Sequence, residues 1–289
     1  MRRGGERNKN KKIVLYSIEK KVFWLIGSLI APVKLLAKKP ALLLPALLSA
    51  LIVFALWLAF LPQMLDIAVN TLILEQVPEA PLTQFLFYFG SMYFFGLLAM
   101  LAFGILAAMV SLSLAYCYAV FVRMDEHGNG SVGKACRETI SGIGKIAGLL
   151  VFALAVALFA GFLLWLALIA GPSLILPGLI VLLGTGLLLF YLCIKLSFAV
   201  QAMGIEKVSV REALQASWKF SEGRFLAMLV FIIVIAVINS IINAVGLGVS
   251  DLVPDDIASM AVFGVFIAIA WAYSGLAMPA YYLKRSGKK

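Results

Sequence analysis

The sequence predicts an all-α integral membrane protein with six transmembrane helices, and three observations support this fold class. Of the 289 residues, 63% are hydrophobic and only 13% are charged. A soluble domain of this length has too little interior to hide so much apolar surface, so a bilayer must be its solvent. The apolar residues also fall into six long runs, and the charges between the runs are segregated by sign.

The six runs define a membrane domain over residues 41–289. Each run is long enough to cross a hydrocarbon core of ~30 Å, which needs about 20 residues in a helix. The second run has 39 residues without a charge, enough for two short spans or for one tilted helix that extends past the bilayer. The spans are expected near residues 41–61, 84–122, 146–169, 174–200, 225–247 and 257–283.

The distribution of Lys and Arg decides between one and two spans in the second run. With one span there and the N-terminus inside, the outer loops 62–83, 170–173 and 248–256 contain six acidic residues and no basic ones. Splitting the run would move Lys207 and Arg211 outside. Positive residues collect in cytoplasmic loops, so we expect six spans in the cell membrane with both termini cytoplasmic. Residues 1–40 are then expected to form a basic cytoplasmic tail and an interfacial helix.

Two stretches between the spans have the pattern of amphipathic helices. In residues 209–224, apolar and small side chains recur at helical spacing, and Ser209 with Glu212 fits a capping box. A related stretch at 132–143 lies 78 residues earlier, and a weaker one precedes the first span. We expect helices in the plane of the inner membrane surface, at a large angle to the span that follows. The interfacial anchors would be Trp218, Arg211, Lys219 and Arg224.

The 78-residue offset indicates an internal repeat. The segment "SFAVQA" from Ser197 aligns with "GLAMPA" from Gly275 at the ends of the fourth and sixth spans. The chain is therefore predicted to contain three hairpin units, each an interfacial helix followed by two spans. Internal repeats are common in transporters, although usually as inverted pairs.

Residues 195–224 read "KLSFAVQAMGIEKVSVREALQASWKFSEGR". This segment resembles a family of six-span, uncharacterised archaeal and bacterial membrane proteins. The family includes the membrane domain attached to some glycerophosphoryl diester phosphodiesterases. Members usually have Arg at the position of Lys195 and Pro at that of Gln201. The phosphodiesterase chemistry belongs to a separate soluble domain, so the resemblance implies a fold and a membrane location and carries no activity.

Few residues are candidates for a binding site. Lys195, near the inner end of the fourth span, either extends its ammonium to the headgroups or binds a lipid phosphate or anionic substrate. Asn239 and Asn243, one helical turn apart, either form hydrogen bonds between helices or contact a polar substrate. The segment "MDEHGNG" at 124–130 contains the single histidine, and it is either a polar loop or a set of metal ligands. Because zinc and calcium spacings are lacking, we expect a loop and no metal site.

The pattern of reactive residues argues against an enzyme. The sequence has no Ser, His and Asp set, no Gly-rich nucleotide loop and no paired carboxylates within a span, and it indicates no cofactor. The net charge of +10 is explained by membrane orientation, so no nucleic-acid partner is expected. We predict a non-enzymatic membrane module that interacts with lipids, through anionic headgroups on the cytoplasmic face, or organises a protein partner. The alternative is a transporter of a small or amphiphilic solute, with a site near Lys195, Asn239 and Asn243.

Overall fold

The structure is a computed structural model that describes residues 26–74, 82–169 and 175–286. The described residues form helices and turns, with no β-strand among them. A helix over residues 26–38 comes first. It is followed by η1 (Pro40–Leu42), α2 (Leu43–Leu74), α3 (Leu82–Glu126), α4 (Val132–Ser141), α5 (Ile143–Ile169), α6 (Ile175–Leu196), α7 (Ala199–Glu206), α8 (Val210–Ser221), α9 (Phe225–Ser250) and α10 (Asp256–Ser286).

Within the described residues, six helical stretches are long and apolar enough to cross a membrane. The predicted all-α class is thereby confirmed, and the number of helices able to span a membrane agrees with the prediction. The stretches are Pro40–Pro62, Leu98–Glu126, Ile143–Leu163, Leu183–Glu206, Phe225–Ser250 and Asp256–Ser286.

The first two long helices extend further than the sequence predicts. The second apolar run lies in one helix, α3, of 45 residues, which is about 68 Å long at 1.5 Å per residue. Helix α2 continues past Pro62 to Leu74, so the expectation of a loop over 62–83 was wrong for much of that range. The apolar helix formers after Pro62 explain this, because the single charge of Asp66 does not end a helix.

The fourth predicted span, 174–200, is not one continuous helix. Helix α6 ends at Leu196, a turn covers Ser197 and Phe198, and α7 then begins at Ala199. The Ser197 hydroxyl donates a hydrogen bond to the backbone oxygen of Ile194 at 2.8 Å, which competes with the helical pattern. The Phe198 ring is fully buried among the rings of Phe220, Tyr281 and Tyr282. Packing of this ring favours the break.

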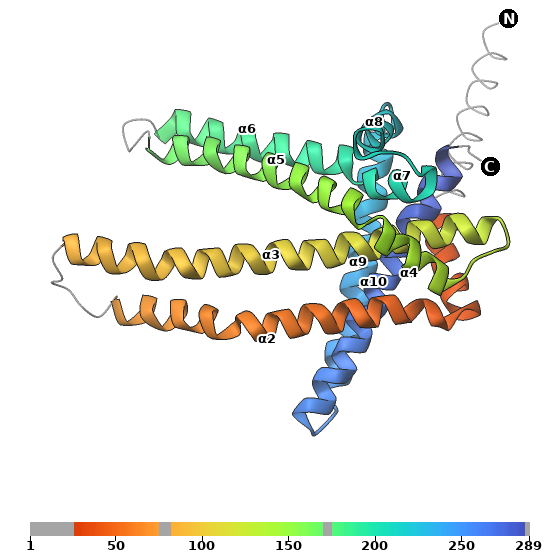
Figure 1. Ribbon diagram of the computed structural model, residues 1–289, viewed down its shortest axis with the longest axis horizontal. Coiled ribbons are helices and arrows are strands. Elements are labelled where there is room, and N and C mark those ends of the chain that lie inside the picture. Colours follow the sequence, from red (N-terminus) through yellow and green to blue (C-terminus); the bar gives the residue numbers. More distant parts are fainter. Residues whose placement is uncertain (1–25, 75–81, 170–174, 287–289) are drawn as a thin grey trace, which may run out of the picture.

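Three pairs of long helices diverge from a common base. Helix α2 lies beside α3, α5 beside α6, and α9 beside α10. In Figure 1 the α2–α3 and α5–α6 pairs both extend to the left and are separated at their far tips, and the α9–α10 pair runs across the direction of the other two. The short helices α4, α7 and α8 gather at the base. We call this base the basic end, because Arg123, Lys145, Lys195, Lys207 and Arg224 lie in the helix ends and turns that form it.

The core lies at the basic end, where α3, α7 and α10 pack closely together. Tyr118 and Phe121 of α3 and Leu276 of α10 are at most 1% exposed. Glycine permits this approach, since a Cβ on Gly204 would come within 2.6 Å of the Ala119 Cβ. A Cβ on Gly275 would likewise collide with the Tyr118 ring.

Helix α8 meets α9 at a sharp turn. Gly223 has a φ of +66°, a left-handed conformation that glycine adopts without steric cost. In Figure 1, α8 is seen almost end-on, whereas α9 runs down through the view. The chain therefore does not continue as one straight helix through residues 209–247, in agreement with the predicted large angle.

Candidate functional site

Lys195 is buried against two aromatic rings near the end of α6. Only 6% of the surface of this residue is exposed to solvent. The Nζ atom lies 4.8 Å from the centroid of the Trp218 ring and 5.5 Å from that of Tyr191. Phe225, the first residue of α9, stacks on Tyr191 with the centroids 5.4 Å apart. Residues from α6, α8 and α9 thus form an aromatic cage around the ammonium, which we call the Lys195 cage.

The break between α6 and α7 fixes the backbone of the Lys195 cage. In an uninterrupted helix, the Lys195 carbonyl would accept the N–H of Ala199. Here it accepts a hydrogen bond from the buried Ser217 hydroxyl of α8, at 2.7 Å. The side-chain hydroxyl therefore compensates the backbone oxygen and ties α8 to the end of α6, which brings Trp218 over the ammonium.

The Lys195 cage holds a cation, the Lys195 ammonium, whose hydrogen-bond donors are not all satisfied. The faces of Trp and Tyr attract an ammonium group, by up to about 2 kcal/mol when the site is desolvated. The group also has three N–H donors, and within the described residues no oxygen accepts from them. Trp218 and Tyr191 are each 39% exposed, so the cage is open on one side. An anionic oxygen that enters there would satisfy the donors.

The predicted asparagines lie elsewhere. Asn239 and Asn243 follow each other by one turn of α9, as predicted, and the Oδ1 atom of each is buried without a hydrogen-bond partner in the described part of the chain. Asn239 is fourteen residues beyond Phe225, the α9 contact of the cage, which is about 21 Å along the helix. The two asparagines therefore lie on one face of α9, and they do not form a cluster with Lys195.

The predicted interfacial anchors lie in three different surroundings. Trp218 belongs to the cage, and Arg211 is exposed on α8. Lys219 and Arg224 line a cleft of about 400 Å³ between α7, α8 and α10. The Arg224 guanidinium lies 5.6 Å from the centroid of the Phe220 ring and donates to the Arg285 carbonyl at 3.4 Å.

The beginning of α8 has the predicted capping box. The backbone N–H and the hydroxyl of Ser209 both donate to the Glu212 carboxylate, at 2.9 and 2.8 Å. The Glu212 N–H donates back to the Ser209 hydroxyl at 3.4 Å. Because the hydrogen bonds from Ser209 favour the charged form, they hold the pKa of Glu212 below its ordinary value.

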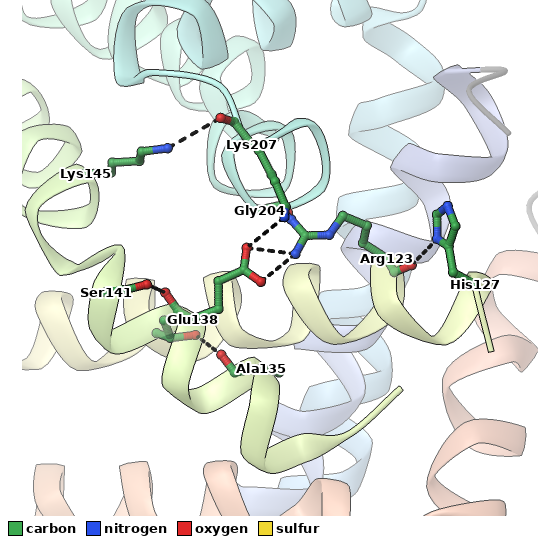
Figure 2. A network of polar contacts seen from close by, with 9 residues as sticks. Arg123, His127, Ala135, Glu138, Ser141, Lys145, Gly204 and Lys207 are labelled. Atoms are coloured by element: carbon green, nitrogen blue, oxygen red, sulfur yellow. Dashed lines mark hydrogen bonds and ion pairs between the residues drawn. The ribbon is translucent and has the colours of Figure 1, made fainter. Parts of the chain in front are cut away.

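A polar clamp that the sequence analysis missed joins three helix ends (Figure 2). Arg123, near the end of α3, bonds both oxygens of Glu138 on α4 at 2.7 Å and the Gly204 carbonyl of α7 at 2.5 Å. Lys145 of α5 donates to the Val208 carbonyl at 3.3 Å. The available signal was Arg123 itself, the first charge after a long uncharged run, and Glu138, an acidic residue among basic ones. Periodicity gives no information on which distant residues pair.

The end of α3 and the turn after it are held by polar contacts. Asp125 forms an ion pair with Lys39 at 2.6 Å, and the His127 Nδ1 lies 2.9 Å from the Arg123 carbonyl oxygen. Among the described residues, no three His, Cys, Asp or Glu side chains are placed to share a metal ion. Residues 124–126 are the last residues of α3, so only residues 127–130 of the predicted loop lie outside the helix.

Comparison with known proteins gives one match. No curated protein and no solved structure matches the chain. Residues 172–273 match the family described as the membrane domain of glycerophosphoryl diester phosphodiesterase. This segment includes all of α6 to α9 and thus every residue of the Lys195 cage. Over these residues, the chain is similar to that membrane domain, as the segment around Lys195 had indicated.

Proposed function

We propose that this protein is a non-enzymatic membrane module that binds anionic lipid headgroups at its basic end. The observation that carries the proposal is the ammonium of Lys195, a residue that is only 6% exposed. This group lies against two aromatic rings and has no oxygen acceptor within the described residues. A lipid phosphate would supply that acceptor, and the exposed edges of Trp218 and Tyr191 would lie at the headgroup boundary.

The distribution of charge supports the same role. In the proposed orientation the basic end faces the cytoplasm, and the outer loop between α9 and α10 contains Asp251 and Asp255 with no basic residue. Each basic residue near an anionic surface contributes about 1 kcal/mol of attraction. Helices α4 and α8 would lie in the plane of this surface, with α8 turned sharply from α9 at Gly223. Organisation of a protein partner by the same surface is compatible with this role.

The test is the lipid content of the purified protein. We expect native mass spectrometry to find bound phosphatidylglycerol in wild-type protein and in Lys195→Arg, which keeps a cation. Lys195→Leu should lose at least one bound lipid, because the substituted side chain has no donor for the phosphate. Lys134→Leu, on the exposed face of α4, is the matched control and should keep the lipid. Unchanged lipid content in Lys195→Leu would rule out the Lys195 cage as the site.

The alternative function is transport of a small or amphiphilic solute, and one observation favours it. Broken helices are common at transporter binding sites, and the chain has a break at Ser197 and Phe198, close to Lys195. The unpartnered oxygens of Asn239 and Asn243 would line the path. A solute path along α9 requires water around Asn239, so the variant Asn239→Cys should react with a membrane-impermeant thiol reagent. Complete protection from both sides would exclude this function.

A further inference from the structure

The basic end contains a second candidate binding site besides the Lys195 cage. The cleft of about 400 Å³ lies between the end of α7, one face of α8 and the end of α10. Glu206 contributes from α7, Gln215 and Lys219 from α8, and Tyr282 from α10. Cavities of 300–1,000 Å³ typically hold small molecules, so the space is larger than a bare inorganic anion needs.

The cleft and the Lys195 cage lie on opposite faces of α8. Glu212, Gln215 and Lys219 line the cleft at spacings of three, four and seven residues, which places them on one side of the helix. Ser217 and Trp218 contact Lys195 from the other side. Each site can therefore be altered through α8 without a change in the residues of the other.

The acidic groups of the cleft already have partners within the fold. Glu206 accepts a hydrogen bond from the Tyr282 hydroxyl at 2.6 Å. Glu212 accepts from Ser209 in the capping box. These carboxylates therefore have reduced capacity to hold a cation, although their charges lower the positive potential of the cleft.

The basic groups of the cleft are less engaged. In the described part of the chain, the Lys219 side chain forms no ion pair or hydrogen bond. Arg224 donates one long hydrogen bond to a backbone carbonyl, which leaves its other N–H groups open. Arg and Lys side chains are the usual ligands of phosphate groups. The aromatic pair Phe220 and Tyr282, with centroids 4.7 Å apart, forms an adjoining wall for an organic part of the ligand.

From this arrangement we infer that the cleft binds a phosphate-bearing ligand through Lys219 and Arg224. The phosphate belongs either to a small molecule from the cytoplasm or to a lipid headgroup. The nearby carboxylates select against bulky polyanions, and the exposure of Lys219 makes binding sensitive to salt. Binding in this cleft is separate from the proposed lipid site at Lys195.

The experiment measures phosphate binding to the full chain in nanodiscs. Titration with inorganic phosphate by calorimetry tests the soluble source, and native mass spectrometry of bound phosphatidylglycerol tests the lipid source. We expect Lys219→Gln to weaken the binding about tenfold or more, because a charge-assisted hydrogen bond is lost. Lys219→Arg should retain binding. Arg137→Gln, an equal charge change on the exposed face of α4 away from the cleft, is the matched control and should bind like the wild type.

The outcomes separate the two sites. The lipid source is tested in Lys195→Leu protein, in which the Lys195 cage holds no lipid. Loss of binding on addition of Lys219→Gln, with retention on addition of Arg137→Gln, supports the cleft, whichever source supplies the phosphate. Equal weakening by Lys219→Gln and Arg137→Gln would overturn the inference, because it would show a general charge effect. Absence of saturable binding from both sources in Lys195→Leu would overturn it too. Neither of these results would alter the expected lipid loss between the wild type and Lys195→Leu.

Discussion

The basic end and the diverging parts of the long helices are held together in different ways. At the basic end, side chains such as Tyr118, Phe121 and Phe198 are almost fully buried, and charged groups are paired across helices. Further along α5 and α6, Leu158 and Leu187 are each 70% exposed. The helix pairs separate in this part of the molecule (Figure 1).

This contrast indicates that the basic end determines how the helices associate. Lipid chains are as apolar as leucine, so the long helices gain little by burying leucine against one another. Association in a bilayer instead requires close packing of small residues and interhelical hydrogen bonds. Both are concentrated at the basic end, through Gly204, Gly275 and the Arg123 clamp. Changes at this end should therefore affect the protein far more than changes in the diverging parts.

The largest expected effect concerns the two ends of the molecule relative to the membrane. In a variant whose three native cysteines are replaced by alanine, Asn129→Cys should be protected from a membrane-impermeant maleimide added outside. Leu252→Cys, which lies in the α9–α10 turn and is 81% exposed, should be labelled. The expected contrast is all or none, because in the proposed orientation the basic end is inside and the α9–α10 turn is outside. Labelling of Asn129→Cys from outside would contradict six spans with cytoplasmic termini.

The next effect is loss of the clamp. Arg123→Ala should lower the free energy of unfolding by about 3 kcal/mol, since it leaves the Glu138 carboxylate and the Gly204 carbonyl without their main donor. Unfolding by SDS in mixed micelles measures this change. Arg137→Ala, an exposed residue on α4, is the control and should change stability by less than about 0.5 kcal/mol. Similar effects of the two substitutions would show that the clamp does not stabilise the basic end.

A smaller effect should come from adding one methyl group at each end. Gly204→Ala forces a Cβ against Ala119 and the α3 backbone, so we expect a loss of about 1–3 kcal/mol from overpacking. Gly161→Ala in α5 has no neighbour within 4 Å and should be neutral, or stabilise by up to about 1 kcal/mol through helix propensity. The same SDS assay compares the two. If Gly161→Ala proved the more harmful, the packing contrast between the two regions would be refuted.

Several features could be predicted because they depend on local sequence. Apolar runs of about 20 residues identify spans whatever their neighbours, since the bilayer imposes that length. The capping box at Ser209 and Glu212 was predictable because its two residues are three positions apart. The single helix in the second run followed from the positions of Lys and Arg, although the extension of α2 beyond Pro62 did not.

Tertiary packing decided the features that join distant segments. Nothing local pairs Arg123 with Glu138 and Gly204, or brings the Cys117 and Cys136 sulfurs within 3.6 Å. The sequence singled out Lys195 as a charge near the end of a span. Only the fold placed the Trp218 ring over it, because the carbonyl exposed by the helix break accepts the Ser217 hydroxyl. Span length and helix caps depend on neighbouring residues, whereas pairing across helices depends on which surfaces meet, and periodicity does not encode that choice.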